Sequence, residues 1–225
     1  MDFKLSIFLE VFPYLLEGAW VTLYLTVVSS AIGIALGLVI GMARVSRFIA
    51  VRGAAMVYIE VIRGTPLLMH LIFLYYGLPF VGINLSAETA GIAGLAGNSA
   101  AYIAEIFRAG ILSVGRGQAE AALALGLTRL QAMRLVILPQ AFRLVLPPLT
   151  NEFAIMLKDS SLVSTLAIAE LLRKGREIVA WKVNVFSPFA GVALLYLAMT
   201  LPLTHLARAL ERRINPERRI PAMLL

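Results

Sequence analysis

The feature that most constrains this chain is a run of residues without a charged side chain, from Trp20 to Met42. Its 23 residues match the roughly 20 that an α-helix needs to cross the hydrocarbon core of a bilayer. Similar apolar stretches recur along the chain, and 60% of its 225 residues are hydrophobic while only 15% are charged. Soluble domains are about 45–50% apolar and about 25% charged. The sequence therefore excludes a soluble enzyme and predicts an integral membrane protein in a lipid bilayer.

Five apolar stretches predict an all-α, polytopic membrane protein with five transmembrane helices in a single domain, residues 1–225. Helices are expected because every backbone group inside a bilayer needs a hydrogen-bond partner within the protein. In the second stretch, Thr65 and Pro66 favour a new helix start, capped by the Thr65 hydroxyl, with a separate or kinked segment before it. The expected spans are about residues 20–43, 56–81, 89–112, 141–168 and 186–207, and the longest connection is residues 113–140.

Basic residues predict the orientation, since Lys and Arg in short loops stay in the cytoplasm. With five spans, three arginine-rich segments fall on one side, so we expect the N-terminus outside and the C-terminus in the cytoplasm. The net charge of +7 is spread between apolar blocks, and it therefore does not predict binding to nucleic acid. The arginines of these three segments are Arg44, Arg47, Arg52, Arg63, Arg116, Arg129, Arg134, Arg143, Arg208, Arg212, Arg213, Arg218 and Arg219.

One connection conflicts with this orientation. Residues 158–186 fall outside, although they carry five basic side chains and only three acidic ones. Counting residues 160–172 as a sixth span would instead place the arginine-rich tail outside, against the same rule. The basic residues of this connection are Lys158, Arg173, Lys174, Arg176 and Lys182.

The first span carries a repeated small residue. Gly33, Gly37 and Gly41 are four residues apart and therefore lie on one helix face. Such a face lets the backbone of another helix approach closely, so we expect it to pack against a helix.

The connection between the third and fourth spans is expected to be ordered. Residues 117–125 favour a helix, and Gly126 suits its C-terminus. Thr128 and Gln131 form a capping box that starts a second helix, which Pro139 is expected to end. Leucines persist along this segment, so it needs a protein partner or lies on the lipid surface.

At this loop the chain resembles a known family. Glu120, Ala121 and Ala122, followed by Gly126 and later by Leu138 and Pro139, match the EAA loop of ATP-binding-cassette importer permeases, and Val136 replaces the usual isoleucine. Residues 60–66, 101–108 and 158–163 narrow the resemblance to permeases for polar amino acids, of the histidine, glutamine and arginine type. The last of these motifs has Ser160 where threonine is more common. The resemblance covers roughly residues 15–212.

The resemblance implies a five-span permease that works with a second copy or a homologue in the plasma (inner) membrane of a prokaryote. Two ATPase subunits would dock at the EAA loop, and an extracytoplasmic binding protein would deliver the amino acid. The chain has no G-x-x-x-x-G-K-[ST] phosphate loop, so ATP and Mg²⁺ would be used by the partner ATPase. We expect no enzyme activity and no cofactor in this chain. Coupling to the ATPase is assigned to Glu120, Ala121, Ala122, Gly126, Leu138 and Pro139.

Polar side chains inside the spans are candidates for a substrate pathway, because they are costly there unless they face a protein interior. Asn98, Tyr102 and Glu105 share one face of the third span. The alternatives are that Glu105 pairs with Arg108 and Lys158 with Asp159, or that the permease leaves selection to the binding protein. With no cysteine and two isolated histidines, no metal site is expected. The candidates in the fourth span are Asn151, Glu152, Lys158 and Asp159.

Two other function classes remain open at this point. The first is a small channel or secondary transporter, although the sequence has neither an internal repeat nor an ion-coordinating motif. The second is a membrane scaffold that transports nothing. For an importer, the surplus of carboxylates among the candidates favours a cationic amino acid, while Asn98, Asn151 and Tyr102 leave glutamine open.

Overall fold

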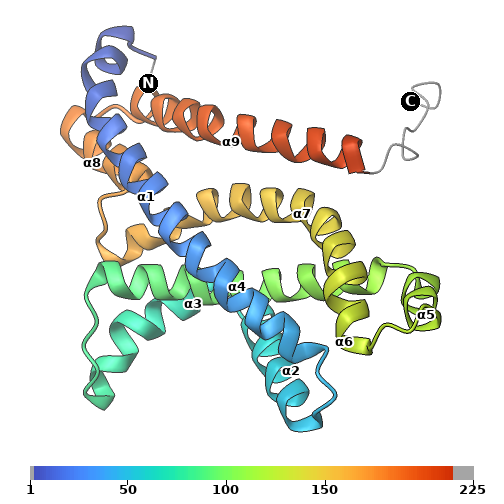
Figure 1. The fold of residues 1–225 in the computed structure, drawn as a ribbon. Helices are drawn as coiled ribbons and strands as arrows, with labels where there is room; N and C mark the ends of the chain where they lie inside the picture. Colours follow the sequence, from blue (N-terminus) through green and yellow to red (C-terminus); the bar gives the residue numbers. More distant parts are fainter. Residues whose placement is uncertain (1–2, 215–225) are drawn as a thin grey trace.

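The computed structural model describes residues 3–214, and this part of the chain contains helices and connections without a strand (Figure 1). The predicted all-α class is confirmed. Arg218 and Arg219 of the basic tail lie outside the described residues. The α-helices are α1 (Leu5–Arg44), α2 (Ile49–Gly64), α3 (Leu67–Ile72), α4 (Ala87–Ser113), α5 (Arg116–Ala124), α6 (Arg129–Ala132), α7 (Leu138–Asp159), α8 (Leu171–Lys182) and α9 (Phe186–Ile214). Shorter turns are the π-helical η1 (Phe73–Gly77) and η3 (Met133–Ile137) and the 3-10 helical η2 (Leu78–Val81) and η4 (Ser160–Leu166).

Among the described residues, three helical segments are long and apolar enough to cross a membrane. They are α1, the rod Arg129–Leu166 and α9, and a fourth results if α2 and Leu67–Val81 count as one broken span. The expected third span lies in α4, which is not among these segments and whose sequence is rich in alanine and glycine. The count of five spans therefore remains a prediction.

The first helix is longer than expected, since α1 begins at Leu5 rather than near residue 20. Its early turns pack on α8 and α9 through a core that includes Leu15, Ile178 and Val192. The Lys4 backbone amide also donates a hydrogen bond to the Ser187 hydroxyl at the start of α9, at 2.8 Å. Packing against these later segments extends the helix beyond the uncharged run.

The predicted glycine face of α1 packs against α4, as expected. A Cβ atom added at Gly37 would lie 2.7 Å from the Cβ of Ile103, and one at Gly41 would lie 3.0 Å from the carbonyl oxygen of Ala104. Both distances are too short for ordinary contact. The two helices can therefore approach this closely only where α1 has no side chain.

The predicted break in the second span is confirmed, because α2 and the segment from Leu67 bend by 102° at Thr65 and Pro66. The expected role of Thr65 is wrong. Pro66 itself is the N-cap of α3, without a side-chain cap, and the Thr65 hydroxyl donates to the Val61 carbonyl of α2 at 2.7 Å. Because proline disfavours helical geometry at the preceding residue, Thr65 is extended and ends α2.

Pro139 does not end the second helix of the loop, and this expectation is corrected. The chain runs as one helical rod from Arg129 to Leu166, with the π-helical turn η3 directly before Leu138 and Pro139. Proline cannot donate to the carbonyl four residues earlier. A wider π turn accommodates that missing bond without breaking the helix.

The helices give the molecule two ends. At one end, the start of α1 contacts α8 and α9, and Figure 1 draws α8 and the starts of α1 and α9 at the upper left. At the other end, the last turns of α1 and α4 lie together and α5 contacts the start of α7. At this end, a cavity lined by Leu144 of α7 and Arg208 of α9 lies between these two helices.

Candidate functional site

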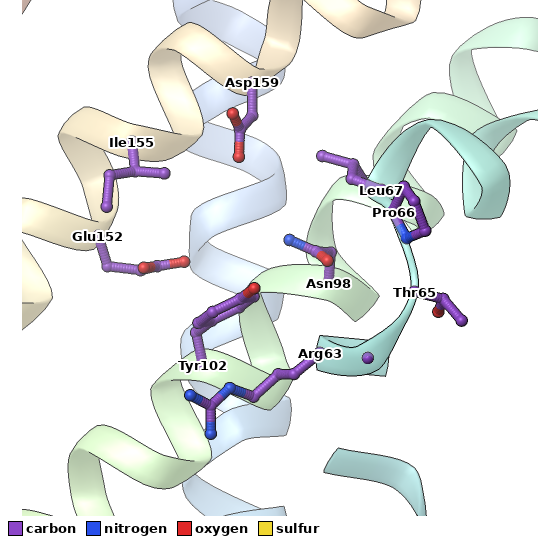
Figure 2. A pocket seen from close by; sticks show the side chains of 10 residues that line it. Arg63, Thr65, Pro66, Leu67, Asn98, Tyr102, Glu152, Ile155 and Asp159 are labelled. Atoms are coloured by element: carbon purple, nitrogen blue, oxygen red, sulfur yellow. The ribbon is translucent and has the colours of Figure 1, made fainter. Parts of the chain in front are cut away.

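A cavity of about 570 Å³ opens where the break between α2 and α3 faces α4 and α7 (Figure 2). The break positions it, because the extended backbone there leaves a gap that a continuous helix would fill. Three separate segments of the chain contribute the walls. The lining residues are Arg63, Gly64, Thr65, Pro66, Leu67, Asn98, Tyr102, Glu152, Ile155 and Asp159.

Two carboxylates form one wall of this cavity. Glu152 and Asp159 are seven residues apart on α7 and therefore share a helix face. Figure 2 shows both side chains directed from α7 into the cavity. Glu152 is buried, and the Ser99 hydroxyl donates a hydrogen bond to its Oε1 atom at 3.2 Å.

A cation also lines this cavity. Arg63, in the last turn of α2, places its guanidinium carbon 5.1 Å from the centre of the Tyr102 ring. An arginine stacked on an aromatic face keeps its hydrogen-bond donors free at the edge. From the sequence, Arg63 served for the orientation and as part of the motif of residues 60–66, and it was not a candidate for the substrate pathway. The sequence feature that could have identified Arg63 as a cavity residue is its position directly before the break at Thr65 and Pro66.

Of the seven predicted pathway residues, four line this cavity: Asn98, Tyr102, Glu152 and Asp159. Glu105 lies further along α4 and pairs with Arg108, with a shortest distance of 2.8 Å, while Arg44 is 3.9 Å away. The alternative reading of Glu105 as a partner of Arg108 therefore fits its contacts. Lys158 is exposed and does not line the cavity.

Asn151 lines a second cavity of about 480 Å³ between α7 and α9. It lies one residue before Glu152, and successive helix residues point about 100° apart. A helix cannot aim both side chains at the same space. The other lining residues are Leu144, Pro147, Pro148, Thr204, Ala207, Arg208 and Glu211.

No group of three or more His, Asp or Glu side chains that could hold a metal ion occurs within residues 3–214.

The predicted coupling loop has the expected form. Helix α5 ends in a Schellman motif, in which the amides of Gly126 and Leu127 donate to the carbonyls of Leu123 and Ala122, at 3.0 and 3.2 Å. Gly126 has a φ of 82°, a left-handed conformation that glycine adopts without strain. The predicted capping box of Thr128 starts α6.

The loop presents its residues unequally. Glu120 and Ala121 are exposed, whereas Ala122 is buried within the loop. Leu138 and Pro139 lie at the start of α7 and are also exposed. Large apolar side chains surround them on the surface: Leu123, Leu125, Leu130 and Leu135. Such an apolar surface on a short connection is typical of a contact site for another protein.

Comparison with known proteins gives consistent matches over nearly the whole chain. Residues 33–216 match the family described as binding-protein-dependent transport system inner membrane component. The chain is 43% identical over 217 residues to the glutamine transport system permease protein GlnP of Escherichia coli (strain K12), covering 96% of this chain and 99% of that protein. It is 36% identical over 216 residues to the arginine transport system permease protein ArtQ of Bacillus subtilis (strain 168), covering 96% of this chain and 99% of that protein.

A solved structure agrees with these matches. The crystal structure of an amino acid ABC transporter with histidines has 43% sequence identity to this chain and a TM-score of 0.90. The match covers 95% of this chain and 100% of that one. The arrangement of helices around the cavity is therefore that of a solved transporter.

Proposed function

The chain belongs to the family of binding-protein-dependent transport system inner membrane components, and on this premise we propose how it moves an amino acid across the membrane. It is the transmembrane subunit of an ATP-binding-cassette importer for amino acids. A small channel, a secondary transporter and a passive scaffold, the alternatives that the sequence left open, do not belong to this family.

We propose that the amino acid binds in the cavity between α2, α4 and α7. A free amino acid carries an ammonium and a carboxylate, and the cavity offers one cation and two anions. Arg63 would receive the substrate carboxylate, since a guanidinium binds a carboxylate through two parallel hydrogen bonds. Glu152 or Asp159 would receive the ammonium. The observation that carries the proposal is that Arg63, Glu152 and Asp159 line one cavity.

The charge balance of the cavity favours a cationic amino acid, such as arginine, lysine or histidine. When Arg63 and one carboxylate hold the zwitterionic backbone, the second carboxylate is left without a partner. A buried unpaired charge is unfavourable, and a positive substrate side chain would pair with it. Glu105 and Lys158 do not line the cavity, so neither enters this charge balance.

Glutamine is the second candidate. The Asn98 amide and the Tyr102 hydroxyl line the same cavity and could bind a neutral side-chain amide. The names of the two relatives divide in the same way, since one transports glutamine and the other arginine.

Uptake into proteoliposomes tests the proposal directly. The complete importer, with its ATPase and cognate binding protein, should accumulate L-arginine, and Glu152→Gln should lower that uptake about tenfold, as expected for loss of one charge-assisted contact. Glu88→Gln is the matched control, because Glu88 is exposed near the start of α4 and bonds to Tyr24, away from the cavity. Arginine uptake by Glu152→Gln equal to that of the parent, with glutamine as the better substrate, would overturn the assignment of a cationic substrate.

We further propose that α5 is the contact with the ATPase. Two ATPase subunits would dock on two permease subunits, identical or homologous, and would use the ATP and Mg²⁺. A short helix fits a groove on a partner, and Glu120 and Ala121 are the exposed residues at its centre. The exposed leucines around them support a protein partner over a lipid surface, because they do not gather on one face of a single long helix.

The membrane orientation is part of the same proposal: five spans, with the N-terminus outside in the inner membrane of a prokaryote and the binding protein approaching that face. Ion pairs soften the conflict between the basic connection 158–186 and this orientation. Lys174 pairs with Glu17 at 2.9 Å and Lys182 with Glu10 at 2.6 Å, so acids of α1 neutralise basic residues of α8.

The pKa shifts on α8 agree with this neutralisation. A hydrogen bond from the Tyr14 hydroxyl, together with the neighbouring Arg173, lowers the pKa of Glu177. Burial opposes the charged form of Lys174, but hydrogen bonds with Glu17 and Tyr14 outweigh it and raise the pKa of Lys174. Both groups are therefore charged and paired at neutral pH, and this outer helix carries less free positive charge than its sequence indicates.

A further inference from the structure

We propose that Ser99 is a positioning residue for substrate, because it holds the Glu152 carboxylate in its orientation toward the cavity. The inference rests on the proposed function, in which Glu152 receives a positive group of the amino acid. Ser99 itself does not line the cavity, so it would act through Glu152 and not by touching the substrate.

The contact between the two side chains is buried and specific. Ser99 is 1% exposed and Glu152 is 8% exposed, and the Ser99 hydroxyl donates to Oε1 of Glu152 at 3.2 Å. Ser99 lies on α4 and Glu152 on α7, so the bond joins two walls of the cavity. With Oε1 held from behind, the Oε2 atom of Glu152 remains available to a ligand.

The first helix fixes the place of the Ser99 side chain. At Gly33, an added Cβ atom would lie 3.2 Å from the Cβ of Ser99 and 3.4 Å from its hydroxyl oxygen. The same atom would lie 3.3 Å from the carbonyl oxygen of Ala96, which is backbone and cannot swing away. Gly33 thus leaves just enough space for the serine, and α1 confines its hydroxyl against α7.

The chemistry explains why this bond affects binding. A buried carboxylate that has lost its hydrogen bond turns to other donors or becomes protonated. Either change reduces its attraction for a substrate ammonium or guanidinium. A hydroxyl that donates to the carboxylate stabilises the ionised form and one orientation of it, without adding a charge that would repel a cationic substrate.

The test is a double-mutant cycle on the complex of permease and ATPase, with equilibrium binding of radiolabelled L-arginine as the readout and L-glutamine as a second probe. Ser99→Ala should weaken arginine binding roughly three- to tenfold, in the range of one lost hydrogen bond. In the Glu152→Gln background, the same substitution should change arginine binding less than twofold, because its target charge is gone. A purely structural role would weaken binding equally in both backgrounds.

The control is Ser113→Ala, since the Ser113 hydroxyl lies on the same helix and donates only to the carbonyl of Gly110 at 2.8 Å. It should leave arginine binding unchanged. Gly33→Ala is a second variant that keeps the serine and displaces it, and it should reproduce the loss. An unchanged affinity in Ser99→Ala, or equal losses in both backgrounds, would overturn the inference while a large effect of Glu152→Gln still supports the proposed function. If Glu152→Gln has no effect, or the parent complex binds neither probe, the proposed function fails and the inference with it.

Discussion

At the scale of single residues, the cavity depends on one arginine whose position is set by an aromatic ring. Arg63 stacks on Tyr102, and Figure 2 shows its guanidinium beneath the Tyr102 ring, among the side chains that line the cavity. Lysine has the same charge but neither the planar fork nor the stacking preference. The proposed binding mode therefore needs arginine and not simply a positive charge.

The first prediction follows from this difference. Arg63→Lys should weaken amino-acid binding by about 1.5 kcal/mol, roughly tenfold, because one of two parallel hydrogen bonds and the stacking are lost. Equilibrium binding of arginine to the complex measures it. Arg52→Lys is the control, since Arg52 is exposed on the same helix and does not line the cavity. Equal affinities of Arg63→Lys and the parent would show that the α-carboxylate binds elsewhere.

Four of the residues that the sequence singled out for the substrate pathway line this cavity. Asn98, Tyr102, Glu152 and Asp159 were recognisable because polar residues inside apolar spans have few tolerable positions. Arg63 was missed because an arginine near a span end is ordinarily a positive-inside signal. Only the 102° bend after it turns it toward α4, and a bend angle cannot be read from residue types.

At the scale of elements, two glycines have different tasks. Gly126 ends α5 in a left-handed conformation, whereas Gly37 lets α1 contact α4. Gly126 is needed for its backbone conformation, whereas Gly37 is needed because it has no side chain. Substitutions at the two positions should therefore have different effects.

The second prediction concerns coupling. Gly126→Pro should abolish ATP-driven uptake while ATP hydrolysis continues, because proline fixes φ near −65° and costs about 3 kcal/mol or more where that does not fit. Glu120→Lys should act in the same direction by reversing the charge at the exposed centre of α5. Parallel measurement of uptake and ATPase rate in proteoliposomes tests both.

A control glycine is available in the same helix. A Cβ atom added at Gly117 meets no atom within 4 Å. The Gly117→Ala variant should therefore couple ATP hydrolysis to uptake as the parent does. A well-expressed double variant, Glu120→Lys with Gly126→Pro, that still transports at the parent rate would remove α5 from the coupling mechanism.

The third prediction concerns packing. Gly37→Ala should destabilise the permease by about 1–3 kcal/mol, the range for overpacking, since its new Cβ would lie 2.7 Å from the Cβ of Ile103. Gly53→Ala should not, because Gly53 on α2 has no atom within 4 Å of such a Cβ. Thermal unfolding in detergent compares the two variants, and an equal melting temperature for both would contradict the packing account.

Element boundaries were predicted less well than element types. The loop helix, its glycine end and its capping box were local signals, and all three are present. The passage of the helix through Pro139 was not foreseeable in the same way, because it depends on the π turn before it. The early start of α1 depends on contacts with α8 and α9, far away in the sequence.

At the scale of the whole molecule, ion pairs connect α1 with α8, two helices that are far apart in the sequence. Glu10 and Glu17 in the N-terminal part of α1 form ion pairs with basic residues of α8, although the paired positions are 172 and 157 residues apart. Sequence reasoning counts charges along the chain and cannot foresee such pairs.

The fourth prediction tests the orientation. The chain contains no cysteine, so a single introduced thiol reports its own side of the membrane. Arg176→Cys, on the exposed face of α8, should react with an impermeant maleimide added to intact cells. Arg52→Cys on α2 should react only after the membrane is opened. The reverse labelling pattern would show that the orientation is the opposite of the proposed one.

In the proposed binding mode, the amino acid binds between Arg63 and the carboxylates of Glu152 and Asp159. The most direct measurement is a structure of the complex of permease and ATPase determined with L-arginine present. We predict density for the amino acid in this cavity, with its carboxylate at Arg63 and a positive group at Glu152 or Asp159. Arginine bound elsewhere, for instance beside Asn151 between α7 and α9, or an empty cavity at saturating arginine, would contradict the account.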